Sequence, residues 1–220
     1  MEPETPLYDL VIFDCDGVLV DSEPITAVVF ARMLNELGLE VGTRDIFDRF
    51  VGRSMEQCLE IIAGMLGHPA PPGFVQEYRD RSAAALEAGV RPVAGIEAVI
   101  EGLGIPYCVA SNGTHDKMRT TLGVTGLLPA FAGRMFGITD VARGKPFPDL
   151  FLHAASRFGA SPARCAVVED TPTGVAAGVA AGMEVFGYCA LTPRHLLSEA
   201  GARVTFERML DLPGLLRGDV

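Results

Sequence analysis

The chain has 220 residues, of which 49% are hydrophobic and 21% are charged, a composition typical of an ordinary globular protein. Its formal net charge of −10 argues against a nucleic-acid partner, because binding to the phosphate backbone needs a basic face. The charge does not exclude a small anionic substrate, since a few local cations or a metal ion can reverse the sign at one site.

Residues 7–14 (LYDLVIFD) predict a first strand, because they form a short apolar run rich in β-branched and aromatic side chains. The acidic segment FDCDGVLVDSE, at 13–23, marks the end of this strand. From about Pro24 to Leu86 we find no convincing strand, and helical periodicity predicts helices at 25–38, 54–67 and 74–89. We therefore predict a small helical cap domain, 23–87, inserted where it can close over a site.

The rest of the chain alternates short apolar runs with helix-like segments. The runs predict strands at 105–112, 165–170, 184–190 and 202–206. Helices are expected at 95–103, 115–122, 148–158, 173–181 and 193–199. Nearly continuous apolar runs indicate strands buried on both faces, so we predict an α/β fold with a doubly wound, mainly parallel, Rossmann-like sheet. The core domain then comprises 1–22 and 88–220.

Three further stretches bear on this arrangement. Residues 133–144 (GRMFGITDVARG) are expected to be irregular. The small-residue tract 174–182 (GVAAGVAAG) predicts a helix that packs closely on the sheet. The last residues, 208–220 (RMLDLPGLLRGDV), predict either a docking helix or a flap that closes on the monomer itself.

Polar groups gather in four short segments, FDCDG (13–17), VASNG (109–113), GKPFPD (144–149) and VVEDTPTG (167–174). Three of them directly follow predicted strands, and ligands of open parallel sheets bind at the carboxyl ends of the strands. Asp14 and Asp16 are like charges so close together that a cation is expected between them. Glu169 and Asp170 bring two more carboxylates to this edge, and a cluster made only of oxygen ligands suits Mg²⁺.

A lysine, a hydroxyl and an amide accompany these carboxylates. Lys145 is one of only two lysines in the chain, the other being Lys117, and a glycine and a proline flank it. Ser111 and Asn112 supply the hydroxyl and the amide. Together with a metal ion these groups predict a phosphate site, because cations that screen the phosphoryl oxygens let a carboxylate approach phosphorus.

The four segments, in this order, resemble the four signature motifs of the haloacid dehalogenase superfamily of phosphohydrolases. The helical insertion after the first segment resembles the cap of its first subfamily. Within the family, VASNGTHDKM and AGMEVFGYCA look most like bacterial sugar-phosphate phosphatases of the 6-phosphogluconate phosphatase type, and next most like β-phosphoglucomutase.

The resemblance implies a role for each matched residue. Asp14 would be the nucleophile that forms an aspartyl-phosphate, and Asp16 would protonate the leaving oxygen and then take a proton from water. Ser111 and Lys145 would hold the phosphoryl group, with Asn112 beside it. Covalent catalysis of this kind splits one difficult step into two.

The resemblance also implies the metal ligands. Mg²⁺ would be bound by the carboxylate of Asp14, the backbone carbonyl of Asp16 and the carboxylate of Asp170. Glu169 would either bind the ion directly or support the residues that do.

Two other reactions of this family are alternatives to phosphate hydrolysis. A dehalogenase needs no second acid, so the presence of Asp16 favours phosphoryl transfer. A mutase of the β-phosphoglucomutase type is the alternative. Thr26 stands where that mutase has a cap histidine, and Met55 where it has an arginine, although Arg53 lies nearby. These departures favour hydrolysis.

Several other side chains receive expectations of their own. In the cap, Glu23 and Arg53 are candidates for contact with the substrate. Asp21 is expected to cap the next helix or bond the loop backbone. His115 is expected to cap a helix or face solvent, and Cys15 to point into the core.

We therefore predict Mg²⁺-dependent hydrolysis of a small phosphate monoester, a sugar or sugar-acid phosphate, by a monomer or weak homo-oligomer with no nucleic-acid or membrane partner. The beginning of the chain, MEPETPLYDL, lacks a signal-peptide core, and no apolar run approaches the roughly 18 residues of a membrane span. None of the five cysteines forms a C-x-x-C pair. Reduced, structural cysteines in a cytoplasmic protein are expected.

Overall fold

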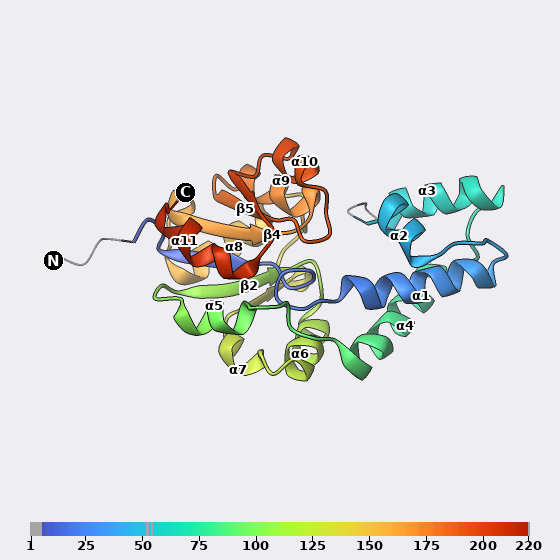
Figure 1. The fold of residues 1–220 in the computed structure, drawn as a ribbon, viewed down its shortest axis with the longest axis horizontal. Coiled ribbons are helices and arrows are strands. Elements are labelled where there is room, and N and C mark those ends of the chain that lie inside the picture. Colours follow the sequence, from blue (N-terminus) through green and yellow to red (C-terminus); the bar gives the residue numbers. More distant parts are fainter. Residues whose placement is uncertain (1–5, 52, 54, 220) are drawn as a thin grey trace. The chain divides into compact units, whose positions relative to one another are not determined.

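The computed structural model describes residues 6–51, 53 and 55–219. The chain divides into two compact units, an α/β unit formed by Met1–Val20 and Arg91–Val220 and a helical unit formed by Asp21–Val90 (Figure 1). These bounds lie two to three residues from the expected limits of 1–22, 23–87 and 88–220.

The α/β unit is built on a single parallel sheet. Its strands are β1 (Leu10–Phe13), β2 (Tyr107–Ser111), β3 (Met135–Gly137), β4 (Cys165–Glu169), β5 (Glu184–Tyr188) and β6 (Val204–Phe206). They lie in the order β3-β2-β1-β4-β5-β6, and every pair of neighbours is parallel. Phe13 of β1 pairs with Val109 on one side and Val168 on the other. The predicted doubly wound parallel sheet is therefore confirmed.

The third strand corrects one expectation. The stretch 133–144 is not wholly irregular, because it contains β3 at the edge of the sheet and a 3₁₀ turn, η1 (Ile138–Asp140). Three residues ending in a glycine are too few to produce a readable apolar period. β3 pairs with β2 through Met135 opposite Val109.

Helices cover both faces of the sheet. They are α5 (Ile96–Gly102), α6 (His115–Val124), α7 (Leu128–Phe131), α8 (Asp149–Phe158), α9 (Pro172–Ala180), α10 (Arg194–Glu199) and α11 (Leu212–Arg217), with 3₁₀ turns η2 (Pro162–Arg164) and η3 (Met209–Asp211). Side chains of α8, α9 and α10 share one buried apolar cluster with Leu10 and Ile12 of β1. Figure 1 shows α5, α6 and α7 (green) grouped together on the other side.

Two small-residue positions explain how elements of this unit pack closely. A Cβ on Gly178 of α9 would lie 2.6 Å from Val185 Cγ2 on β5, so the tract 174–182 does bring its helix close to the sheet. A Cβ on Gly95 would lie 2.9 Å from Leu210 Cγ of η3. The segment of η3 and α11 packs on α5 of the same unit, which agrees with a closing element rather than a docking helix.

The helical unit has its own core. It contains α1 (Glu23–Glu36), α2 (Thr43–Arg49), α3 (Met55–Leu66) and α4 (Phe74–Gly89). The Phe30 ring lies 5.1 Å from that of Phe50 and 4.8 Å from that of Tyr78. The helix α2 escapes sequence analysis because Ile46 is its one buried residue.

Two smaller expectations concern polar and sulfur groups. Asp21 does not cap α1, because Ser22 occupies the N-cap position and Asp21 is exposed. All five cysteines are buried and none forms a disulfide, and Cys15 is 1% exposed.

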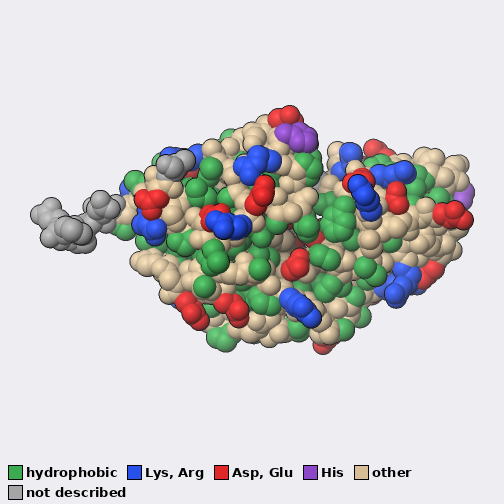
Figure 2. Space-filling model, in the orientation of Figure 1, with side chains coloured by type: hydrophobic (Ala, Val, Ile, Leu, Met, Phe, Trp, Pro, Cys, Tyr) green, Lys and Arg blue, Asp and Glu red, His purple; other side chains and the backbone are tan. Residues whose placement is uncertain are grey.

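Among the helices that the structure describes, none is long and apolar enough to cross a membrane. On the face shown in Figure 2, basic and acidic side chains lie interspersed.

Candidate active site

The ends of three neighbouring strands bring the predicted site residues together. Asp14 follows β1, Ser111 ends β2, and Glu169 ends β4 with Asp170 next in the chain. The order of the strands reverses between β1 and β4. In open parallel sheets such a reversal is where ligands bind.

Three carboxylates form a compact cluster at this point. One oxygen each from Asp14, Glu169 and Asp170 lies within 4.8 Å of the others, and all three residues are buried. Buried like charges repel one another and lose hydration, so this cluster needs cations.

The cluster fits a hard divalent cation. Its donors are carboxylate oxygens, which such cations prefer. Two glycines make room for these carboxylates. A Cβ on Gly17 would lie 2.0 Å from Asp170 Oδ2, and one on Gly174 would lie 1.8 Å from Glu169 Oε1.

Lys145 places an ammonium group against two of the carboxylates. Its Nζ donates to Asp14 Oδ1 and, at 2.6 Å, to Glu169 Oε1, and its side chain is 4% exposed. Burial alone would lower the pKa of Lys145, but the two carboxylates raise it above its usual value. Burial has the largest effect on Asp14 and raises the pKa of its carboxyl group to about 7. The charge of Lys145 lowers this pKa, and the charges of Glu169 and Asp16 raise it further.

Hydrogen bonds to the backbone hold the loop that carries Lys145. The side chain of Asn112 donates through Nδ2 to Lys145 O at 3.1 Å, and its Oδ1 accepts from Lys145 N at 2.8 Å. Both polar side-chain atoms of Asn112 are therefore bonded to the Lys145 backbone, and its expected place beside the phosphoryl group stays a prediction. Ser111 Oγ accepts from Gly113 N at 3.0 Å.

Glu169 is fixed by a second set of bonds. Its Oε2 accepts from the backbone N–H groups of Asp170 and Thr171, both at 3.1 Å, and from Thr171 Oγ1 at 2.9 Å. Thr171 also caps α9, since its Oγ1 accepts from Gly174 N at 3.1 Å. One carboxylate of the cluster therefore has its orientation set by the helix that follows β4.

The carboxylate of Asp16 belongs to a different pair. Lys117 Nζ, from α6, lies 2.6 Å from Asp16 Oδ2, and the two side chains are 38% and 23% exposed. The cluster of three carboxylates does not include that of Asp16. The metal contact expected of Asp16 is through its backbone carbonyl and stays a prediction.

Comparison with known proteins now decides the family. Residues 8–182 match the model of the haloacid dehalogenase-like hydrolase family. The chain belongs to this family. The resemblance of the four sequence segments is thereby confirmed.

Similar proteins of known sequence or structure cover between 80% and 96% of the chain. The 6-phosphogluconate phosphatase of Escherichia coli (strain K12) is 32% identical over 208 residues, 94% of this chain and 94% of its own. The β-phosphoglucomutase of Bacillus subtilis (strain 168) is 30% identical over 190 residues, 80% of this chain and 81% of its own. A crystal structure of a conserved haloacid dehalogenase-like protein of unknown function from Agrobacterium tumefaciens (strain C58) has a TM-score of 0.90 at 35% identity, covering 96% of this chain and 99% of its own.

In this hydrolase the helical unit holds the two expected substrate contacts. Glu23 is the first residue of α1. Arg53 is exposed, and its Nε donates to Arg49 O at 2.7 Å. Thr26 Oγ1 bonds backbone oxygens of its own helix. The roles of Glu23 and Arg53 in binding stay predictions.

Two side chains near the site differ from what the sequence suggests. Lys117 is missed as a partner of the site, although its being one of only two lysines was a usable signal. His115 does not cap α6, because the N-cap residue is Thr114. Its ring is partly exposed and contacts another side chain. Its Nε2 lies 2.8 Å from Asp140 Oδ2, which also accepts from Gly137 N at 2.8 Å.

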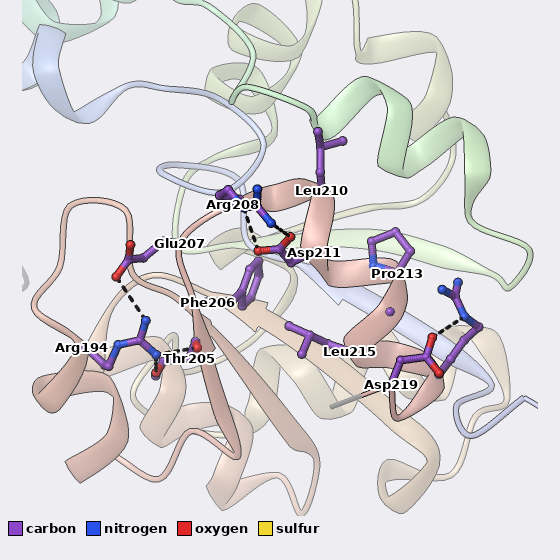
Figure 3. Close-up of a pocket in the computed structure, with 12 residues that line it drawn as sticks. Arg194, Thr205, Phe206, Glu207, Arg208, Leu210, Asp211, Pro213, Leu215 and Asp219 are labelled. Carbon is purple, nitrogen blue, oxygen red and sulfur yellow. Dashed lines mark hydrogen bonds and ion pairs between the residues drawn. The ribbon is translucent and has the colours of Figure 1, made fainter.

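A wide hollow of about 710 Å³ lies along β6 and the C-terminal segment, lined by none of the site residues (Figure 3). Three arginines line it, and each has a carboxylate partner. The pairs are Arg194–Glu207 at 3.1 Å, Arg208–Asp211 at 2.7 Å and Arg217–Asp219 at 3.0 Å. Since these guanidinium groups are already neutralised, the hollow is a poorer anion site than the cluster around Lys145.

Proposed function

We propose that this protein hydrolyses a small phosphate monoester, a sugar or sugar-acid phosphate, with the help of Mg²⁺. The observation that carries the proposal is the buried group of Asp14, Glu169 and Asp170 with the ammonium of Lys145 against two of its members. The α/β unit would be the catalytic domain and the helical unit the cap. The 6-phosphogluconate phosphatase relative supports the substrate class.

The residues that would hold Mg²⁺ are Asp14, Glu169 and Asp170 together with the backbone carbonyl of Asp16. A bound Mg²⁺ would neutralise part of this negative charge and draw electron density from the phosphoryl oxygens. The chain's own cation acts in the same direction, because Lys145 is buried and stays protonated.

The proposed reaction uses two aspartates in turn. Asp14 attacks phosphorus, a bond forms between its carboxylate oxygen and phosphorus, and the bond from phosphorus to the leaving oxygen breaks. Asp16 gives its proton to that oxygen. Water then attacks the aspartyl-phosphate, Asp16 takes a proton from it, and inorganic phosphate leaves Asp14 free again.

The remaining site residues bind and orient. Lys145 and the hydroxyl of Ser111 would contact the phosphoryl oxygens, where charge builds up in the transition state. Asn112 would act through the loop, since its amide fixes the backbone of Lys145. Closure of the cap would exclude bulk water, with Glu23 and Arg53 as the candidate contacts to the rest of the substrate.

A phosphosugar mutase is the second candidate, favoured by the β-phosphoglucomutase relative. Thr26 and Met55 stand where the family pattern of that mutase has a histidine and an arginine. We therefore favour water over a second sugar phosphate as the acceptor.

The test is phosphate release from a panel of phosphorylated metabolites, with Mg²⁺ and with a chelator. The panel contains 6-phosphogluconate, hexose 6-phosphates, β-glucose 1-phosphate, glycolate phosphate and nucleoside monophosphates. Metal-dependent release from a sugar or sugar-acid phosphate is expected. Release from nucleoside monophosphates alone would overturn the substrate class, and release unaffected by the chelator would overturn the role of the metal. Isomerisation of β-glucose 1-phosphate with a bisphosphate primer, without phosphate release, would identify a mutase.

We expect this activity in the cytoplasm, in a monomer or weak homo-oligomer without a nucleic-acid or membrane partner. The net charge of −10 supports the absence of a nucleic-acid partner. Gel filtration and the salt dependence of any DNA binding would test these expectations.

A further inference from the structure

The only two lysines of the chain are each matched with one of the two aspartates that follow β1. Lys145 contacts Asp14, and Lys117 contacts Asp16. The two pairs differ in exposure, because the Lys145 side chain is 4% exposed and that of Lys117 is 38% exposed. The first pair lies inside the carboxylate cluster, and the second lies outside it.

The local fold places Lys117 for this contact. It lies in the first turn of α6, which begins directly after the segment that ends β2, and its backbone N donates to the capping Thr114 Oγ1 at 3.3 Å. Asp16 lies in the turn after β1, where Gly17 N donates to Val20 O at 2.9 Å. Two segments 101 residues apart are thus joined by one ion pair.

A divalent ion held by the cluster would be an alternative partner for the carboxylate of Asp16. Asp16 is two residues from Asp14, so its carboxylate could turn toward this ion. A fourth carboxylate would bind the ion more tightly, and a carboxylate bound to a metal cannot carry a proton to the leaving oxygen.

We propose that Lys117 is a positioning residue that keeps the carboxylate of Asp16 off the metal ion. Among the described residues, the side chains that meet the ion would then be those of Asp14, Glu169 and Asp170. The carboxylate of Asp16 would carry out proton transfer. The proposal rests on the proposed function for its catalytic consequence, but its structural part concerns metal binding alone.

A lysine is suited to this task. Its ammonium is a compact charge on a flexible stem, so it can hold a carboxylate in one position and release it when the substrate arrives. Partial exposure of both side chains keeps the pair weak enough to open.

A double-mutant cycle on metal affinity tests the proposal without turnover. Binding of Mn²⁺ to the full-length protein is measured by electron paramagnetic resonance for the wild type, Asp16→Asn, Lys117→Met and the double variant. We expect Asp16→Asn to change the Kd less than about 3-fold in the wild-type background and to weaken binding by about 10-fold in the Lys117→Met background. If Asp16→Asn changed the Kd by the same factor in both backgrounds, the proposal would be overturned. The loss of a nearby negative charge would by itself have the same effect with and without Lys117.

Activity supplies the second readout. Lys117→Met should lower kcat by about 10²-fold with KM within about 3-fold, and Lys117→Arg should restore most of kcat because it keeps the cation. The matched control is Arg119→Met, which removes an exposed cation paired with Asp116 at 2.9 Å on the same helix and should leave kcat and the Mn²⁺ affinity unchanged. Losses in kcat equal for Lys117→Met and Lys117→Arg would overturn the proposal. If no phosphate release is found from any substrate, the proposed function fails, and the metal cycle still decides the role of Lys117.

Discussion

The carboxylate cluster at the strand ends and the hollow along β6 both gather ionised side chains, but in opposite ways. In the cluster, three buried carboxylates lie together and one ammonium contacts two of them. In the hollow, three arginines each have a carboxylate of their own near the surface (Figure 3). Buried and unbalanced charge destabilises the folded protein, so its presence indicates a catalytic or binding site. Charge that is exposed and balanced needs no such explanation.

The largest expected effect separates chemistry from stability at the cluster. Asp14→Asn should lower phosphate release by at least about 10⁴-fold, because it removes the nucleophile. The same variant should raise the free energy of unfolding of the metal-free protein at pH 8 by about 1 kcal/mol, because burial penalises the ionised Asp14. Chemical denaturation and the phosphate assay measure the two effects. A folded variant with near-full activity would contradict the mechanism.

The next effect tests how tightly the cluster is built. In Gly174→Ala the new Cβ would lie 1.8 Å from Glu169 Oε1, so the Glu169 carboxylate must leave the position in which it contacts Lys145. We expect kcat to fall by about 10- to 100-fold and stability to fall by about 1–3 kcal/mol.

The control for this change is Gly123→Ala, in the helix α6. Its nearest neighbour would be Leu128 Cδ2 at 3.9 Å, an ordinary contact. This variant should keep full activity and gain about 0.5–1 kcal/mol from helix propensity. Equal behaviour of the two variants would mean that the position of Glu169 does not matter.

Tyr8 is an intermediate case, because it is buried like the carboxylate cluster but has charged partners near the surface like the arginines of the hollow. Tyr8 is 4% exposed and donates to Glu184, which Arg203 also contacts. Burial, with the hydrogen bond to Glu184 next, raises the pKa of Tyr8 from 10.0 to about 12. Because the folded state holds this proton more tightly, the contribution to stability is complete below pH 10 and is lost as the pH rises through about 12.

The Tyr8→Phe variant isolates that contribution. Between pH 10 and 12 the wild type should lose about 1–2 kcal/mol more unfolding free energy than the variant. Urea titrations at a series of pH values measure the difference. Parallel curves would show that Tyr8 titrates alike in both states.

The smallest effect is expected in the hollow. Arg208→Ala removes an exposed guanidinium paired with Asp211 at 2.7 Å, where the Arg208 side chain is 81% exposed. The free energy of unfolding, measured by thermal denaturation, should change by less than about 0.5 kcal/mol, and the rate of phosphate release should not change. A large loss of activity would break the comparison, because the hollow would then belong to the reaction.

Sequence analysis succeeds where a residue type and a strand end coincide. Asp14, Ser111 and Glu169 directly follow or end strands whose apolar runs are readable, so their meeting is predictable. It fails where the deciding contact joins distant segments. Lys117 lies on a helix, where a lysine ordinarily faces water, and its partner is 101 residues away.

Other limits are those of local pattern. The residue type of Asn112 suits a phosphate contact, but only the structure shows its amide bonded to the backbone of Lys145. The strand β3 is too short for its period to be read. Glu23 and Arg53 lie outside the four matched segments, so no pattern assigns them a ligand.

The helical unit leaves the α/β unit and returns to it through segments that pair with each other. Val20 forms a bridge with Pro92, and Val93 N donates to Leu19 O at 3.0 Å. These contacts join the two ends of the insertion within the α/β unit, and the register of β1 is set separately by its pairing with β2 and β4. Natural selection can therefore exchange, lengthen or trim residues 21–90 as a cassette while the inherited chemistry stays in place. Under the proposed function, changes confined to residues 21–90 would alter substrate preference and leave the reaction as it is.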